Sequence, residues 1–200
     1  MANVSRVNGF RPVGHLSGAN WNGKVRKYWI PAADGTATFV GDLVNLNGSA
    51  DADGTPGVDQ ATASSVPCGV IVWFEPNPSD LTQNYRPASQ NLASQGAGRW
   101  CYVADSPDLV MEAEEDAVGG TIPVTDAGLN VSPIVGSGST TTGQSGMAID
   151  SSTTDTTSTL TLRLLGWVKR PDNEVGVANA KMLVGFNVHQ YGSVGTTGIA

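Results

Sequence analysis

The chain has 200 residues, of which 40% are hydrophobic and 14% charged, with 25 Gly and 11 Pro. That composition excludes a long-helix protein and favours short strands joined by turns. The net charge of -7 argues against nucleic acid as a direct partner, and no run of about 18 apolar residues exists to span a membrane. A chain of this size exposes roughly 8,900 Å² and buries about 70% of its unfolded surface. The length therefore predicts one domain, with or without an arm.

The first 33 residues differ in charge from the rest of the chain. They contain five cations and no carboxylate, since Asp34 is the first acid. The segment carries +5, whereas the other six cations and all 18 acids give the remainder -12. Two interpretations stay open: a soluble domain with basic residues near its start, or a basic arm that docks on an acidic neighbour. For the second, we place an extended basic arm at residues 1–33 and a β-rich domain at residues 34–200.

Residues 8–23 show no helical or strand period, so we expect them to lack regular structure. They are nevertheless too apolar for a solvated tail, and aromatic residues among arginines have the composition of an interface hot spot. We therefore expect the segment to lie against another surface. The predicted partner-interface residues are Arg6, Phe10, Arg11, Trp21, Lys24, Arg26 and Lys27.

Strand patterns begin after this segment. Residues 24–31 and 37–46 predict strands, and residues 47–57 have turn composition throughout. Residues 67–74 are the most apolar run and predict a strand buried on both faces. The prolines of residues 75–79 end it, because proline removes ladder donors and fixes φ.

The middle of the chain predicts a long loop followed by short strands. Residues 80–98 indicate an excursion with one helical turn, and loops of this length tend to be functional or to make contacts. Two strands are expected at residues 99–104 and 109–114, on either side of a turn. Residues 121–124 and 129–135 add two further candidates.

The last third is polar before it becomes apolar again. Residues 136–159 are of low complexity and fit either a flexible linker or an edge hairpin. Residues 159–168 alternate Leu with polar residues and predict a half-buried antiparallel strand, and residues 181–189 predict a final strand. About ten short antiparallel strands predict an all-β protein, a β-barrel or β-sandwich with an irregular N-terminal arm.

One aspartate-rich turn invites comparison with a calcium loop. Asp51, Asp53 and Asp59 supply oxygen ligands near a glycine. The loop lacks the third ligand before the glycine and the glutamate at its twelfth position. An Asp-Gly turn is the favoured interpretation, and we expect no metal and no cofactor.

Four carboxylates cluster at Glu112, Glu114, Glu115 and Asp116. Such a group can bind a metal or supply an acid and base pair, but no histidine lies nearby and no apolar neighbour is expected to raise a pKa. The favoured interpretation is a solvated strand edge that discourages mispairing. The alternative is an acidic docking patch that receives a basic arm.

Other chemistry finds little support. The sequence has no phosphate-cradling loop and no nucleophile elbow, and neither His15 nor His189 has a triad spacing. Cys68 and Cys101 sit in apolar strands, where cysteine acts as a small hydrophobe. The start of the chain shows no secretory signal, so we expect cytoplasmic folding and reduced thiols. The five tryptophans are expected to be core anchors, except Trp21.

Three stretches carry a family resemblance: residues 8–58, the YRPAS at residues 85–89, and the LRLLGWVKRPDNEVGVANAKMLVGFNVHQY at residues 162–191. Together they resemble virion structural proteins of tailed bacteriophages, most closely the capsid decoration, or cement, proteins. The resemblance implies a cofactor-free β-rich domain that binds the outside of an assembled shell, commonly as a trimer. The implied partners are the major capsid protein and other copies of this chain, with assembly in the host cytoplasm.

We therefore expect a non-enzymatic capsid decoration protein located in the virion. A tail-tube or other head-tail component is the alternative within assembly proteins. A carbohydrate-binding β-sandwich module is a less favoured class, because no secretory signal is seen and the tryptophans are not clustered in sequence. A hydrolase would rest on the acidic cluster alone.

Overall fold

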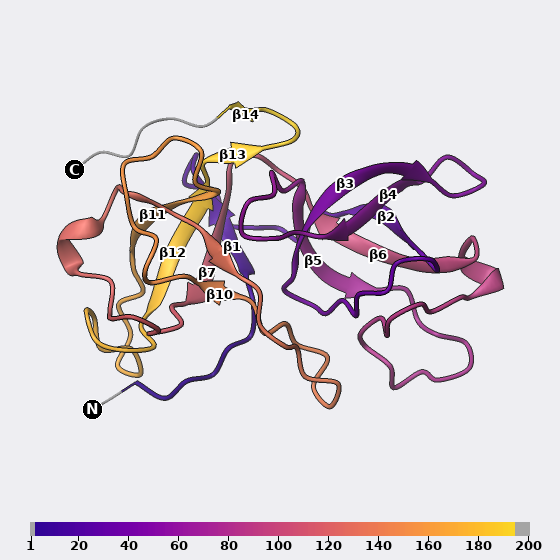
Figure 1. Cartoon of the computed structure of the whole chain (residues 1–200), viewed down its shortest axis with the longest axis horizontal. Helices are drawn as coiled ribbons and strands as arrows, with labels where there is room; N and C mark the ends of the chain where they lie inside the picture. Colours follow the sequence, from indigo (N-terminus) through magenta and orange to yellow (C-terminus); the bar gives the residue numbers. More distant parts are fainter. Residues whose placement is uncertain (1–2, 195–200) are drawn as a thin grey trace.

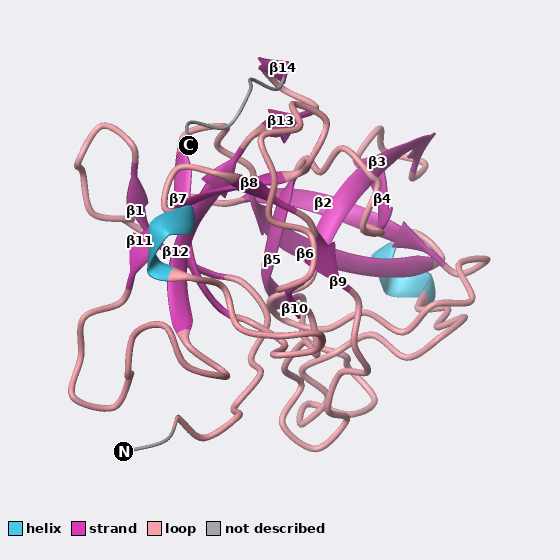
Figure 2. Ribbon diagram, turned by 60° about the vertical axis from the view of Figure 1, so that its left-hand side comes forward, coloured by secondary structure: helices cyan, strands magenta, loops and turns pink. Residues whose placement is uncertain are grey.

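The computed structural model describes residues 3–194 as an all-β protein with two short 3-10 turns, which confirms the predicted fold class (Figures 1 and 2). Its accessible surface is 9033 Å², close to the value expected for this mass. The strands form two lobes side by side, a closed barrel and a five-stranded sheet.

The barrel, on the right in Figure 1, closes in the order β2-β4-β3-β5-β6. Its pairs are antiparallel except for the parallel contact of β2 with β4. Alternation fills the interior: Tyr28 and Ile30 of β2 and Cys101 and Val103 of β6 are each at most 2% exposed. The barrel strands are β2 (Arg26–Pro31), β3 (Leu43–Ala50), β4 (Pro56–Gln60), β5 (Gly69–Phe74) and β6 (Gly98–Ala104).

The second lobe is an antiparallel sheet in the order β1-β7-β12-β11-β8. Its strands are β1 (Arg11–His15), β7 (Leu109–Glu114), β8 (Asn130–Val131), β11 (Leu162–Trp167) and β12 (Lys181–Phe186). The remaining elements are short: η1 (Ala93–Gln95), η2 (Val124–Asp126), β9 (Pro133–Ile134), β10 (Ala148–Ile149), β13 (Val188–His189) and β14 (Ser193–Val194).

The lobes share one hydrophobic core. Phe10, 1% exposed, packs in a cluster that contains Leu43 and Val70 of the barrel together with buried residues of β7, β11 and β12. The Phe10 N–H donates to the Gly41 carbonyl (2.9 Å). A Cβ on Gly9, whose φ is +68°, would lie 2.5 Å from that oxygen, so only glycine allows the approach.

The N-terminal segment is integrated into both lobes. Residues 11–15 form β1, which pairs with β7, and residues 26–31 form β2 of the barrel. The expectation that residues 8–23 lack regular structure is therefore wrong at β1. The pairing comes from β7, almost 100 residues further along the chain, which no local period can reveal.

Other departures from the sequence expectations have local causes. Strand β3 continues to Ala50, into the predicted turn, because β4 pairs with it. Strand β5 is buried on both faces through Val70 and Ile71, as predicted, except that Trp73 near its end is 43% exposed. Val124 begins a 3-10 turn where a strand was expected. The polar stretch at residues 136–159 packs onto the fold through β10, whose Ile149 is fully buried.

The long excursion after β5 contains the predicted helical turn as η1. Two fully buried arginines tie down its surroundings. The Arg86 guanidinium donates to the carbonyls of Pro31, Asp34 and Thr36, and Arg99 donates to Gln83 and Gln90. A guanidinium offers five donors, so each arginine fixes several loop segments at once.

Candidate functional site

Three hollows follow the N-terminal segment, two of them between the lobes and one against the sheet lobe alone. The central one, about 500 Å³, has a mixed lining, in which the apolar side chains include Phe10, Pro12, Trp21 and Val72. It shares Arg11 with a polar hollow of about 250 Å³ at one end, and Trp21 with one of about 190 Å³ at the other. We call the three together the inter-lobe groove.

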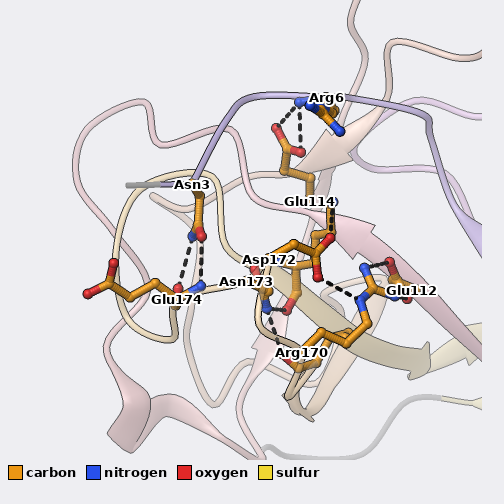
Figure 3. Close-up of polar contacts among 10 residues, drawn as sticks. Asn3, Arg6, Glu112, Glu114, Arg170, Asp172, Asn173 and Glu174 are labelled. Atoms are coloured by element: carbon orange, nitrogen blue, oxygen red, sulfur yellow. Dashed lines mark hydrogen bonds and ion pairs between the residues drawn. The ribbon is translucent and has the colours of Figure 1, made fainter. Parts of the chain in front are cut away.

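The first end of the groove is charged (Figure 3). Arg170 donates to both carboxylate oxygens of Glu112 at 2.9 Å and to Asp172 at 3.2 Å. The backbone N–H of Arg6 donates to both oxygens of Glu114 at 3.0 and 3.1 Å. Hydrogen bonding with Glu112 raises the pKa of Arg170, and that with Arg170 lowers the pKa of Asp172. These three carboxylates are thus already engaged within the chain.

The other end of the groove is built around Asp105, which is 8% exposed. Its Oδ2 accepts from the Tyr28 hydroxyl at 2.7 Å and pairs with the Arg26 guanidinium at 3.2 Å. Lys24 and Tyr191 also line this hollow. The Asp105 charge is therefore neutralised locally.

The groove differs in charge from the molecule as a whole. The side chains of Arg6, Arg11 and Lys24 are exposed, and among the described residues they have no hydrogen bond or ion pair. The groove thus places unpaired cations on both sides of a central hollow of mixed lining, on a protein whose net charge is -7.

The groove gathers most of the predicted interface residues. All of them except Lys27 line it, although they come from an integrated segment and not from a free arm. The Phe10 side chain is buried in the core beneath the groove, so in this conformation it cannot insert into a partner. Sequence reasoning missed Arg170 and Lys181, because only the β7–β12 pairing brings them to the N-terminal segment.

The acidic cluster does not form one patch. Glu112 and Glu114 share a face of β7 and line the groove, as alternation on a strand predicts. Glu115 is fully buried and accepts from the Ile122 N–H at 2.8 Å, and Asp116 accepts from the Ser151 N–H and hydroxyl. Burial raises the pKa of Glu115, so the expectation of no apolar influence is wrong there. The loop after β7 folds back and encloses it.

A second surface feature lies on the outer face of the barrel. Trp73 stacks on Tyr102 with ring centroids 4.2 Å apart, and the Lys27 ammonium lies 4.0 Å from the Trp100 ring centroid. We call these four residues the aromatic face. The expectation that Trp73 and Trp100 are core anchors is wrong, because strand register turns both outward. Alternate aromatic positions at residues 100 and 102 were the available signal.

The aspartate-rich loop is a turn closed by its own backbone. Asp51 Oδ1 accepts from the N–H groups of Asp53 and Thr55, as the favoured interpretation predicts. Within residues 3–194, no group of three or more His, Cys, Asp or Glu is placed to hold a metal ion. Cys68 and Cys101 are free, buried thiols.

The structure is thus a β-barrel joined to an antiparallel sheet, with hollows that follow the N-terminal segment. Comparison of the chain with protein-family models, curated proteins and solved structures found no match. Of the helical segments described, none has the length and apolar character needed to cross a membrane.

Proposed function

We propose that this chain is a non-enzymatic virion structural protein that binds the exterior of an assembled phage capsid and stabilises it. The observation that carries the proposal is the inter-lobe groove, a preformed surface lined by six of the seven residues predicted to contact a partner. Together with the sequence resemblance, it supports the major capsid protein as the partner. Self-association, for example as a trimer, belongs to the same proposal.

Stabilisation follows from selective binding. A protein that binds the assembled shell and not its separated subunits favours the shell by mass action, about 2.7 kcal/mol per site at a hundredfold excess over Kd. Many equivalent sites multiply this effect. No catalytic step or cofactor is required.

The test compares capsids assembled with and without the protein. Shells lacking it should have normal geometry but rupture at lower temperature or under milder osmotic shock, and the purified protein should restore resistance. If shells fail to assemble without it, or if it localises to the tail, the tail-tube or head-tail alternative replaces this proposal.

A second candidate function is carbohydrate binding, which the aromatic face favours. Trp73 presents an exposed indole beside Tyr102, whose hydroxyl donates to Glu75 at 2.7 Å. Stacking rings with polar groups beside them suit a sugar. Affinity electrophoresis against soluble glucan, mannan and lipopolysaccharide should show retardation that Trp73→Ala abolishes; absence of any retardation removes this candidate.

A further inference from the structure

The inter-lobe groove has an ordered chemical pattern along its length. The unpaired Arg6 and Arg11 side chains flank one end, the central chamber exposes apolar side chains such as Trp21 and Val72 among polar groups, and the unpaired Lys24 stands at the other end. A bound segment would therefore meet cations, then a chamber with an apolar wall, then a cation. Shape and charge together restrict what fits.

The negative charges that would pair with Arg6, Arg11 and Lys24 must come from the bound molecule. Glu112 is engaged by Arg170, Glu114 by the Arg6 N–H, and Asp105 by Arg26 and Tyr28. The groove's own carboxylates are consequently not available to the three free cations. Charge complementarity across an interface favours specific encounter and suppresses wrong partners.

We propose that the inter-lobe groove binds an extended segment of the capsid protein in which acidic residues flank an apolar side chain. This inference rests on the proposed function, because it names the chemistry of the partner at the same site. The apolar side chain enters the chamber beside Trp21 and Val72. The carboxylates pair with Arg6 or Arg11 at one end and Lys24 at the other.

A second copy of this chain is a poorer occupant. Several of its aspartates are engaged in closed turns: Asp80 accepts from the Thr82 N–H, Asp150 from the Ser152 N–H and Asp155 from the Thr157 hydroxyl. Carboxylates held in such turns do not lie along an extended chain. Two copies at -7 each also repel one another at long range.

The experiment uses the full chain and fluorescent peptides in an anisotropy titration. The probe is a short peptide with acidic residues on both sides of a central leucine; its counterparts carry lysines for the acids or serine for the leucine. The acidic leucine peptide should bind most tightly, and added salt should weaken it. The double variant Arg6→Gln/Lys24→Gln, which removes one free cation at each end, should lose about tenfold in affinity.

The matched control is Lys169→Glu, which makes the same change of two in net charge at an exposed residue that does not line the groove. The control should bind the peptide and capsids as the parent does. Equal peptide affinity in the groove variant and the control, or no saturable binding of the acidic peptide, overturns the inference. So does concentration-dependent self-association that only the groove variant loses, since the occupant is then a second copy.

The same two variants separate this inference from the proposed function. If the parent binds isolated capsids and the groove variant binds them equally well, the decoration function stands and the groove assignment fails. If the parent binds the peptide but no capsid, the groove assignment stands for another acidic partner class and the proposed function fails.

Discussion

The barrel and the sheet lobe reach stability by different routes. The barrel comes from one continuous stretch, residues 26–104, and encloses a compact cluster that includes Tyr28, Ile30 and Cys101. The sheet lobe joins residues 11–15 to strands that begin at residue 109 or later, and its edge strand β8 has only two residues. The barrel therefore has a hydrophobic cluster of its own, whereas the sheet lobe packs on a cluster that it shares with the barrel through Phe10.

The largest expected effect is at Phe10, which tests whether the sheet lobe depends on its contact with the barrel. Truncation of this buried ring, as Phe10→Ala, should cost about 3–5 kcal/mol in the free energy of unfolding, because it leaves a cavity where the lobes join. Urea denaturation followed by circular dichroism measures the loss. Val13→Ala, at a side chain 40% exposed on β1, is the control and should change little. A loss below about 1 kcal/mol would mean that the lobes do not depend on this contact.

The two lobes also differ in how far the sequence predicted them. Short runs of apolar and aromatic residues bounded by turn residues located β2, β5 and β6 within a few residues. Local sequence patterns could not reveal the groove, because Arg170 and Arg6 line the same hollow only after distant strands have paired. The burial of Arg86 was equally hidden: only the folded loops reveal its three carbonyl partners.

A pH experiment examines the junction through Asp42, which is fully buried beside Gly41. Burial raises the pKa of this carboxyl to about 6, despite hydrogen bonds from Phe39 and Gln60 that favour the charged form. A raised acid pKa adds stability that is complete below the unfolded value near 4 and is lost as pH rises through 6. The span is about 3 kcal/mol. Asp42→Asn should remove this contribution, so that stability in thermal melts between pH 4 and 6 rises more steeply with pH in the variant than in the parent; equal slopes contradict the assignment.

His189 in β13 acts with the opposite sign. Burial lowers the pKa of this imidazole to about 4, and its Nδ1 accepts from the Tyr191 N–H at 3.0 Å. Stability from a lowered histidine pKa is present above the unfolded value near 6.5 and is lost as pH falls towards 4, again over about 3 kcal/mol. His189→Asn keeps an acceptor and should remove this contribution. Because the contributions of Asp42 and His189 nearly cancel between pH 4 and 6 in the parent, the His189 variant should lose stability as pH rises through this range, whereas the Asp42 variant should gain it.

The smallest expected effect is at the rim of the sheet lobe. Glu112→Gln weakens the paired hydrogen bonds with Arg170, whose side chain is 42% exposed, and should cost less than about 1 kcal/mol. The difference should shrink in high salt, since exposed charges are screened. Paired urea titrations at low and high ionic strength measure it. A large loss in the free energy of unfolding that does not depend on salt would show that this ion pair is a main support of the sheet lobe.

The pairing of β1 with β7 fixes an order of events during synthesis. Arg11 of β1 lies opposite Glu112 of β7. About 100 further residues must therefore be synthesised before β1 can pair with its neighbour in the sheet. All five barrel strands emerge in that interval, and domains generally fold as units while the chain is being made. A barrel that has already closed shortens the effective loop between β1 and β7 and lowers the entropy cost of joining them. The folded barrel thus holds β1 close to the point in the chain where β7 emerges, so that the two strands can pair.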